Sequence, residues 1–298
     1  MSCLMKTGIN PIRKSNKCNL KCKFCYHYGN LENQKPIPDD VWEIGGTKFY
    51  EEDIEHLLSV YKRPYGVAYV YLEPFIEIEK YYSIIKKMNF AGIYQHIYTN
   101  GTLVTENKLK LLGEMGLDEI RFNLGASNCS EEVIEMIKIA KKYIKYVGIE
   151  TPMTPEFFKE FLKNREKILN TNLDFINCAE LHLNDFNLVN YKDEKVYISR
   201  YGYISPIWSR ELTIKLMKIA SEENWNVVVH DCSNRTKFFR DLNFNSKLNM
   251  WFGANSYGIE FKKIPFKNFM LTLLDENFIF LEEEELPIAL KVNNIVNI

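Results

Sequence analysis

Short apolar runs alternate with longer amphipathic segments along most of the chain, a pattern that predicts strands followed by helices. The expected strands cover residues 8–12, 67–72, 93–99, 119–124, 146–150, 174–179 and 225–230. The expected helices cover residues 76–88, 105–115, 130–143, 154–169 and 210–223, with a partly helical region at 39–61 that Gly45-Gly46 interrupts. Strands and helices in alternation indicate βα units and a parallel sheet.

Several expected helices carry residues typical of helix ends. Thr105 and Ser130 precede apolar-periodic segments and are expected to cap them, since their hydroxyls accept hydrogen bonds from free N–H groups of the first turn. Gly116 is suited to end the first of these helices. Pro155 falls in the first turn of the 154–169 segment, where its missing N–H costs nothing.

The number of repeating units limits the fold. The pattern gives about six βα units and one further strand before Asp231, fewer than the eight of a complete (βα)8 barrel. We therefore expect an α/β fold in which residues 1–240 form a partial (βα)6 parallel barrel. Residues 241–298 hold short apolar runs separated by Lys, Asn and Glu. They predict a small C-terminal β-rich appendage packed on the barrel.

Composition excludes some classes of function. The 298 residues carry a net charge of −1, so no overall basic surface argues for nucleic acid. No apolar run approaches the roughly 20 residues of a membrane span. The N-terminal residues lack the apolar region of a signal peptide, so we expect a cytoplasmic protein without a membrane partner.

Three of the seven cysteines stand within eight residues, as Cys18, Cys22 and Cys25 in C-x3-C-x2-C spacing. Thiolates are soft ligands that select zinc, copper(I) or iron–sulfur clusters. A structural zinc site needs four protein ligands, which Cys3 or His27 can complete. Three cysteines can instead hold a [4Fe–4S] cluster with one iron left open to another ligand. The residues alone leave both sites open.

The C-x3-C-x2-C spacing, with Phe24 before the last cysteine and a strand before the loop, resembles the radical S-adenosylmethionine (SAM) superfamily. The resemblance extends over roughly residues 1–235 and implies a partial (βα)6 barrel. It also implies a [4Fe–4S] cluster on the three cysteines, and SAM as the ligand of the open iron. The resemblance implies an anaerobic oxidoreductase that makes a 5′-deoxyadenosyl radical and abstracts hydrogen from a small molecule or peptide. A ferredoxin or flavodoxin is the usual electron donor.

A narrower resemblance, to proteins related to the pyruvate formate-lyase activating enzyme, makes a glycyl-radical activase one alternative. A non-catalytic iron–sulfur or zinc protein is another. Tyr71-Leu72-Glu73-Pro74 resembles the family's Gly-Gly-Glu-Pro segment without its two glycines. The resemblance implies that Glu73 accepts a hydrogen bond from the SAM amino group. The other residues implied to contact SAM are Tyr26, Asn100, Asn123, Ser127 and Ile149.

Two late strand ends are unusually polar. Ligands of parallel α/β folds bind at the carboxyl ends of strands, so these residues are candidates for substrate binding or catalysis. His230 and Asp231 cannot both face one site from an extended strand, because neighbouring side chains point to opposite faces. Cys232 is a candidate hydrogen-atom donor. The candidate set is Glu180, His182, His230 and Cys232.

Overall fold

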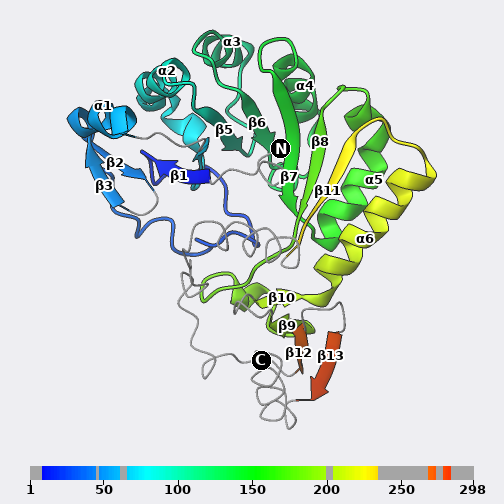
Figure 1. The fold of residues 1–298 in the computed structure, drawn as a ribbon. Helices are drawn as coiled ribbons and strands as arrows, with labels where there is room; N and C mark the ends of the chain where they lie inside the picture. Colours follow the sequence, from blue (N-terminus) through cyan, green and yellow to red (C-terminus); the bar gives the residue numbers. More distant parts are fainter. Residues whose placement is uncertain are drawn as a thin grey trace.

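The structure, a computed structural model, contains one large sheet whose parallel strands follow one another in chain order. It describes residues 9–44, 47–60, 66–198, 204–233, 268–272 and 278–282. The parallel strands are β1 (Ile9–Arg13), β4 (Gly66–Tyr69), β5 (Tyr94–Thr99), β6 (Glu119–Phe122), β7 (Tyr146–Pro152), β8 (Phe175–Ala179) and β11 (Val228–Cys232). Figure 1 shows this series of strands enclosed by an arc of helices.

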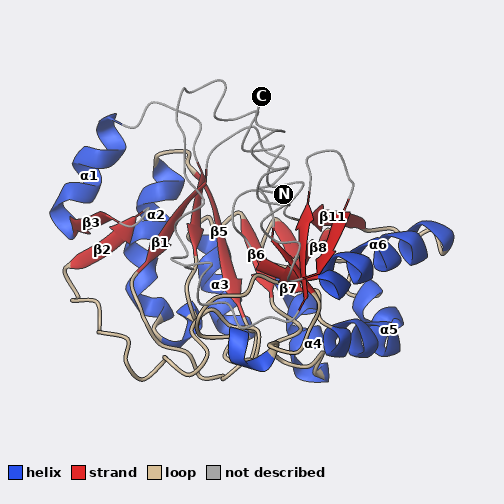
Figure 2. Ribbon diagram, turned by 90° about the horizontal axis from the view of Figure 1, so that it is seen from below, coloured by secondary structure: helices blue, strands red, loops and turns tan. Residues whose placement is uncertain are grey.

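One helix separates each parallel strand from the next. These helices are α1 (Glu51–Val60), α2 (Tyr82–Phe90), α3 (Glu106–Glu114), α4 (Glu131–Ala140), α5 (Pro155–Leu169) and α6 (Ile207–Glu222). They cover the outer face of the sheet, as both views show (Figures 1 and 2). Six βα units followed by β11 confirm the expected partial parallel barrel.

Local sequence determines several helix ends. The hydroxyls of Thr105, Ser130 and Thr154 accept hydrogen bonds from backbone N–H groups three residues ahead, at 3.4, 3.4 and 3.2 Å. Gly116 follows α3 with a φ of +86°, a conformation that glycine adopts without strain. The expected caps are therefore confirmed.

The region 39–61, expected to be helical in part, is helical in its second half, where α1 lies. Its first half contains an antiparallel pair, β2 (Val41–Ile44) and β3 (Thr47–Tyr50), which extends the sheet beyond β1. The apolar and aromatic residues here suit strands, and pairing of Ile44 with Ile12 gives β2 a partner on the barrel. Gly45 and Gly46 lie outside the described residues.

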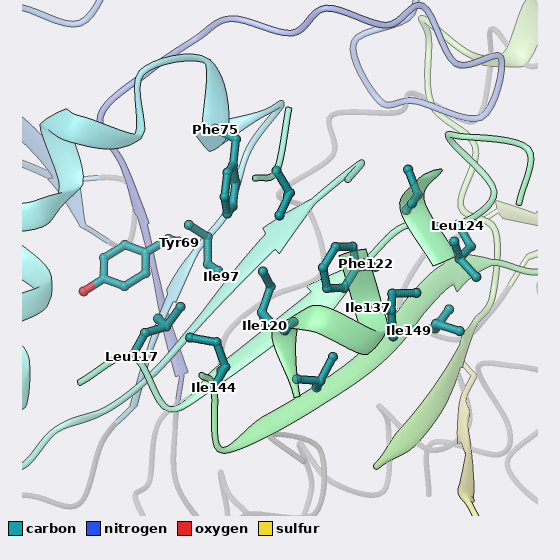
Figure 3. Close-up of a cluster of buried hydrophobic side chains, with 14 of the residues drawn as sticks. Tyr69, Phe75, Ile97, Leu117, Ile120, Phe122, Leu124, Ile137, Ile144 and Ile149 are labelled. Atoms are coloured by element: carbon teal, nitrogen blue, oxygen red, sulfur yellow. The ribbon is translucent and has the colours of Figure 1, made fainter. Parts of the chain in front are cut away.

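The hydrophobic core lies between the sheet and the helices. Alternate strand residues, including Ile97, Ile120 and Ile149, are fully buried in it, together with Ile137 of α4 (Figure 3). Neighbouring strand residues point to the opposite face. Tyr98, Arg121 and Glu150 therefore face the inside of the barrel, which is polar at this level.

A second sheet has the order β10-β9-β12-β13. It joins β9 (Val196–Ile198) and β10 (Ile204–Pro206), which precede α6, to β12 (Asn268–Thr272) and β13 (Phe278–Glu282). The pairing of β12 with β13 is antiparallel. Most of residues 241–298 lie outside the described part, so the division into domains at residue 240 stays a prediction. None of the described helices has the length and apolar character needed to cross a membrane.

Candidate functional site

The cysteine loop, residues 14–28, follows β1 directly. Its backbone turns twice, where Cys25 N–H donates to the Cys22 carbonyl and Tyr28 N–H donates to the Cys25 carbonyl, both at 3.0 Å. The three cysteines are half-buried. Leu20 N–H approaches Cys18 Sγ at 3.5 Å, and His27 N–H approaches Cys25 Sγ at 3.4 Å. Such N–H groups stabilise a thiolate and are suited to sulfurs that bind metal.

Burial raises the pKa of Cys18, Cys22 and Cys25. For Cys22 the pKa rises to about 12, because the neighbouring Cys25 and Cys18 add to the effect of burial. The thiolates therefore need a positive partner, which a bound metal centre supplies. Among the described residues, no group of three His, Cys, Asp or Glu side chains is arranged to hold a single metal ion. A [4Fe–4S] cluster binds each thiolate to a different iron, so its ligands need not meet at one point.

His27 and Cys3 were the residues able to close a zinc site. His27 is half-buried beside the cysteine loop, and its Nδ1 has no hydrogen-bond partner in the described structure. Burial and the charge of Arg13 lower the pKa of His27, which favours the neutral imidazole that can bind a metal. Cys3 lies outside the described residues.

Glu73 lies at the carboxyl end of the strand next to β1, and it is 1% exposed. Its carboxylate accepts hydrogen bonds from Phe75 N at 3.0 Å, Thr99 Oγ1 at 2.9 Å and Asn100 N at 2.6 Å. Burial raises the pKa of Glu73 to about 7 in spite of these bonds, which lower it. A buried carboxylate in this state favours a cationic ligand such as an ammonium group.

The two residues before Glu73 adopt a backbone conformation that favours glycine. Tyr71 has a φ of +75° and Leu72 a φ of +53°, both in the left-handed region. The strand consequently ends at Tyr69, three residues earlier than expected. This conformation costs a non-glycine residue about 1–2 kcal/mol. The turn therefore retains the shape of a glycine-containing segment although the glycines themselves are absent.

We expect the free energy of unfolding of Tyr71→Gly to be about 1 kcal/mol higher than that of Tyr71→Ala. Glycine adopts the positive φ without strain, whereas alanine does not. The comparison removes the ring in both variants, including its contact with the Arg13 guanidinium at 4.8 Å. At the exposed strand residue Tyr50 the order should reverse, with glycine the less stable by about 0.5–1 kcal/mol. Urea unfolding of the four variants measures both differences. Equal stability of the Tyr71 pair would contradict the strain.

Hydrogen bonds tie the first half of the cysteine loop to the ends of β4 and β5. Glu73 N–H donates to the Lys17 carbonyl at 2.9 Å. The Asn100 amide donates to Asn19 Oδ1 at 2.9 Å, and its own Oδ1 accepts from Thr102 N at 3.0 Å. The structure thus brings Glu73 and Asn100 together beside the cysteines.

The remaining residues expected to contact SAM divide into two groups. Asn123, at the end of β6, accepts hydrogen bonds from Thr151 Oγ1 and from Ala126 N, both at 3.1 Å. Ser127 donates to the Leu124 carbonyl at 3.3 Å in the loop that follows. Ile149 is fully buried in the core on the helix side of the sheet (Figure 3). Contact of Ile149 with adenine stays a prediction that this position disfavours.

The late strand ends bring the expected substrate residues near one another. Parallel pairing of β8 and β11 places Cys232 opposite Ala179, and Glu180 N–H donates to the Cys232 carbonyl at 3.2 Å. His230 Nδ1 lies 2.6 Å from Asn177 Oδ1 inside the barrel. His182 is buried, and its ring centroid lies 6.4 Å from that of Tyr26 in the cysteine loop.

Asp231 confirms the alternation of faces along this strand. Its carboxylate pairs at 2.7 Å with Arg210 of α6, on the helix side, whereas His230 faces inward. The strand itself is shifted from the expected 225–230 to Val228–Cys232. Register with β8 determines this position, since Val228 pairs with Phe175.

A buried polar network inside the barrel was missed by the sequence analysis. Tyr98 Oη lies 3.0 Å from Arg121 Nη1 and donates to Glu150 Oε2 at 3.1 Å. Arg121 also forms ion pairs with Glu119 and Glu150. Glu150, Asn177 and His230 lie opposite one another on three neighbouring strands. The alternation of side chains along each parallel strand, which turns every second residue into the barrel, was the signal that could have identified these residues.

Comparison with known proteins decides the family. The family model described as the radical SAM superfamily matches residues 12–168, just over half of the chain. The chain belongs to the radical SAM superfamily. Members use a [4Fe–4S] cluster and SAM, and the chemistry of three close cysteines beside a buried carboxylate fits both. Cys18, Cys22 and Cys25 would hold the cluster here, and Glu73 would face the SAM amino group.

Among relatives of this radical SAM chain, a Methanocaldococcus jannaschii protein is provisionally named a glycyl-radical enzyme activating enzyme. It is 34% identical over 182 residues, which cover 57% of this chain and 46% of the relative. The cofactor-modifying protein of the tungsten-containing aldehyde ferredoxin oxidoreductase of Pyrococcus furiosus is 23% identical over 187 residues, with shares of 56% and 49%. The chain thus spans about half the length of the curated relatives it matches.

The structure of Streptococcus suis SuiB bound to SAM is similar in fold. Its TM-score is 0.53 at 14% sequence identity, and the match covers 91% of this chain and 59% of SuiB. At this identity the similarity supports the architecture alone, namely the partial barrel that the order of the strands already indicates.

Proposed function

We propose that this chain is a radical SAM enzyme that cleaves SAM reductively and abstracts a hydrogen atom from a peptide or protein. One observation carries the proposal: the three-cysteine loop lies beside the buried Glu73 at the carboxyl ends of parallel strands. When bound, a reduced [4Fe–4S] cluster supplies the electron that splits SAM into methionine and a 5′-deoxyadenosyl radical. A small ferredoxin or flavodoxin is the electron donor we expect, and the cytoplasm the location.

The chain's own residues would orient SAM and exclude water. Three hydrogen bonds fix the Glu73 carboxylate, so it can accept from an ammonium group without reorganising. Asn100 and Asn123 add polar groups at the next two strand ends. The inward residues of the barrel and the late strand ends, including Glu180 and His182, then face the space where a substrate carbon must approach SAM.

The Pyrococcus furiosus relative is named for modifying a cofactor, whereas other named proteins support a peptide or protein substrate. They include the provisionally named activating enzyme, a sulfatase-maturating enzyme of Clostridium perfringens that is 25% identical over 203 residues, and SuiB, whose structure is also known with the precursor peptide SuiA. Activation of a glycyl-radical enzyme is the second candidate, favoured by the 34% identity to the first of these. Formation of a glycyl radical on a partner protein would distinguish it.

The test is anaerobic reconstitution of the chain with iron and sulfide, followed by dithionite and SAM. We expect 5′-deoxyadenosine and methionine in equal amounts. A reconstituted protein that binds iron and sulfide but forms no 5′-deoxyadenosine would contradict the proposal and favour a non-catalytic metal protein.

Cys232 and His230 are proposed to act on the substrate side. Cys232 is buried at the end of β11, where its thiol can give a hydrogen atom to a substrate radical. The thiyl radical left on Cys232 would then take one electron from the ferredoxin or flavodoxin and one proton to become a thiol again. Cys178 provides a matched control, because it is buried on the helix side of the adjacent strand. Once a peptide substrate is available, Cys232→Ala should lose product while it still forms 5′-deoxyadenosine, and Cys178→Ala should keep both. Full turnover by Cys232→Ala would remove this residue from the mechanism.

A further inference from the structure

Three asparagines donate hydrogen bonds to the backbone of the cysteine loop from the segment that follows β8. The side-chain amide of Asn184 donates to the Tyr26 carbonyl at 3.0 Å, and that of Asn187 donates to the Phe24 carbonyl at 3.1 Å. The amide of Asn190 donates to the Lys23 carbonyl at 2.9 Å. We call Asn184, Asn187 and Asn190 the asparagine clamp.

The clamp is a built structure in which the amides of Asn184 and Asn187 have a defined orientation. Asn187 is fully buried, and its amide also donates to the His182 carbonyl at 3.0 Å. Its Oδ1 accepts from Asn184 N at 2.8 Å, while Asn184 Oδ1 accepts from Phe186 N at 3.1 Å. Because an asparagine side chain has one acceptor end and one donor end, these bonds determine which end faces the loop.

The three amides lie on one side of their segment, since all three donate to carbonyls of the same loop. Asn190 ends a short 3₁₀ helix, Leu188–Asn190, and Asn187 stands at the start of this helix. Side chains three apart in a 3₁₀ helix point in the same direction, which aligns Asn187 with Asn190. One side of this segment therefore meets three carbonyls that flank Cys25.

The second half of the cysteine loop depends on such contacts. The hydrogen bonds from Cys25 N–H to the Cys22 carbonyl and from Tyr28 N–H to the Cys25 carbonyl close turns within this half and do not connect it to the barrel. Its first half is held by Glu73 and Asn100 at the ends of β4 and β5. The clamp holds the half that contains Cys25 from the opposite side of the barrel, against the end of β8.

We propose that Asn184, Asn187 and Asn190 are positioning residues that fix the Cys22–Cys25 half of the loop relative to β8. The effect of the clamp on a bound cluster rests on the proposed function, whereas its effect on the loop does not. The same short segment carries Glu180 and His182, and Asn187 bonds the His182 carbonyl directly. A ligand that moves this segment would therefore also move the cluster-binding loop.

Hydrogen exchange of the cluster-free chain tests the clamp without any cofactor. The double variant N184A/N190A removes two donors at half-buried positions and leaves the buried Asn187 in place. One lost hydrogen bond of typical strength corresponds to about fivefold in an equilibrium, so we expect exchange about 25-fold faster at the Cys25 and Tyr28 amides. Helix α4 should keep its protection.

Asn164 gives the matched control, because its amide donates at 2.9 Å to a backbone carbonyl, that of Glu160 in α5. N164A should leave exchange in the loop unchanged. Restoring an amide in N184A/N190Q should return part of the protection. Loop exchange equal to that of N164A would overturn the proposal, and so would an equal rise in α4, which indicates general destabilisation.

A spectroscopic measurement tests the consequence for the cluster. In the reconstituted, reduced protein we expect the electron paramagnetic resonance spectrum of N184A/N190A to differ from wild type in g-values or line width, while N164A matches wild type. An unchanged spectrum would overturn the link between the clamp and the cluster. If no iron–sulfur spectrum forms in any variant, the proposed function fails, whereas the exchange measurement still decides on the clamp.

Discussion

Replacing Cys18, Cys22 or Cys25 singly by alanine is expected to abolish both the iron–sulfur absorption of the reconstituted protein and its formation of 5′-deoxyadenosine. Each thiolate binds a different iron of a [4Fe–4S] cluster, so two remaining cysteines cannot hold it. The loss should exceed the about 10- to 100-fold effect of changing an outer-shell partner of a metal site. Iron and sulfide analysis, with 5′-deoxyadenosine chromatography, measures the result.

Two further cysteines provide controls of the same chemistry. Cys129 and Cys178 are buried in the hydrophobic core, away from the loop. Replacing either by alanine should leave iron content near that of wild type, although the free energy of unfolding falls because packing is lost. The comparison separates loss of a ligand from loss of a buried thiol.

His27→Ala and Cys3→Ala distinguish an open cluster from a closed zinc site. An open cluster needs neither side chain, so both variants should retain about four irons per chain. A closed site needs a fourth protein ligand, which one of these residues would supply. Loss of metal in either variant, with one zinc per chain in the wild type, would contradict the radical SAM assignment of the site.

Much of the barrel could be predicted because its information is local. Each βα unit carries its own apolar run, amphipathic helix and caps, as Thr105 and Ser130 show. The β2–β3 pair could not be predicted in this way. Its residues form strands because β1 offers an edge on which to pair, and that edge belongs to the folded sheet. Likewise, register with β8 determines where β11 begins.

The candidate site shows the same division. The cysteine motif is contiguous, and Glu73 stands at a strand end that the sequence marks with a proline. The network of Tyr98, Arg121 and Glu150 depends instead on the alignment of three strands. The asparagine clamp joins groups more than 150 residues apart in the sequence. Neither set of contacts has a local sequence signature. Only the alternation of inward and outward side chains along a strand indicates the network of Tyr98, Arg121 and Glu150.

Ile149 illustrates the limit of transferring a family role by sequence position. The family resemblance implies that an apolar residue of this strand packs on adenine. The structure places it among Ile137 and Phe122 in the core (Figure 3). Its neighbours Gly148 and Glu150 have the inward parity, so a one-residue difference in register decides whether a strand residue can meet a ligand.

Glu73→Gln is expected to weaken SAM binding about 30-fold at pH 8, because a charge-assisted hydrogen bond to the SAM amino group contributes about 2 kcal/mol. Equilibrium binding of SAM to the reconstituted protein measures the change. The affinity of wild type should also fall as the pH drops below about 7, the pKa of this carboxyl in the free protein, because the protonated form has lost its charge. The glutamine variant should show no such dependence. Equal SAM affinity of the two proteins at pH 8 would remove Glu73 from the SAM site.

The same carboxyl makes a separate prediction about stability. Its pKa of about 7 in the folded protein is above the ordinary value of 4.5, so the folded state holds more protons between these values. Stability from this group therefore increases as the pH falls, by about 2 kcal/mol between pH 8 and 5.5. In Glu73→Gln this part of the pH dependence should disappear, as urea unfolding of the cluster-free protein can measure.

Glu77 is the control. Burial raises its pKa, but hydrogen bonds from Ser15, Lys17 and Lys80 outweigh burial and lower the pKa to about 2. Glu77→Gln should consequently keep the pH dependence of wild type over this range. If Glu73→Gln keeps the pH dependence as well, the carboxyl at position 73 stays ionised over this range. That result would contradict the buried position of Glu73 in the structure.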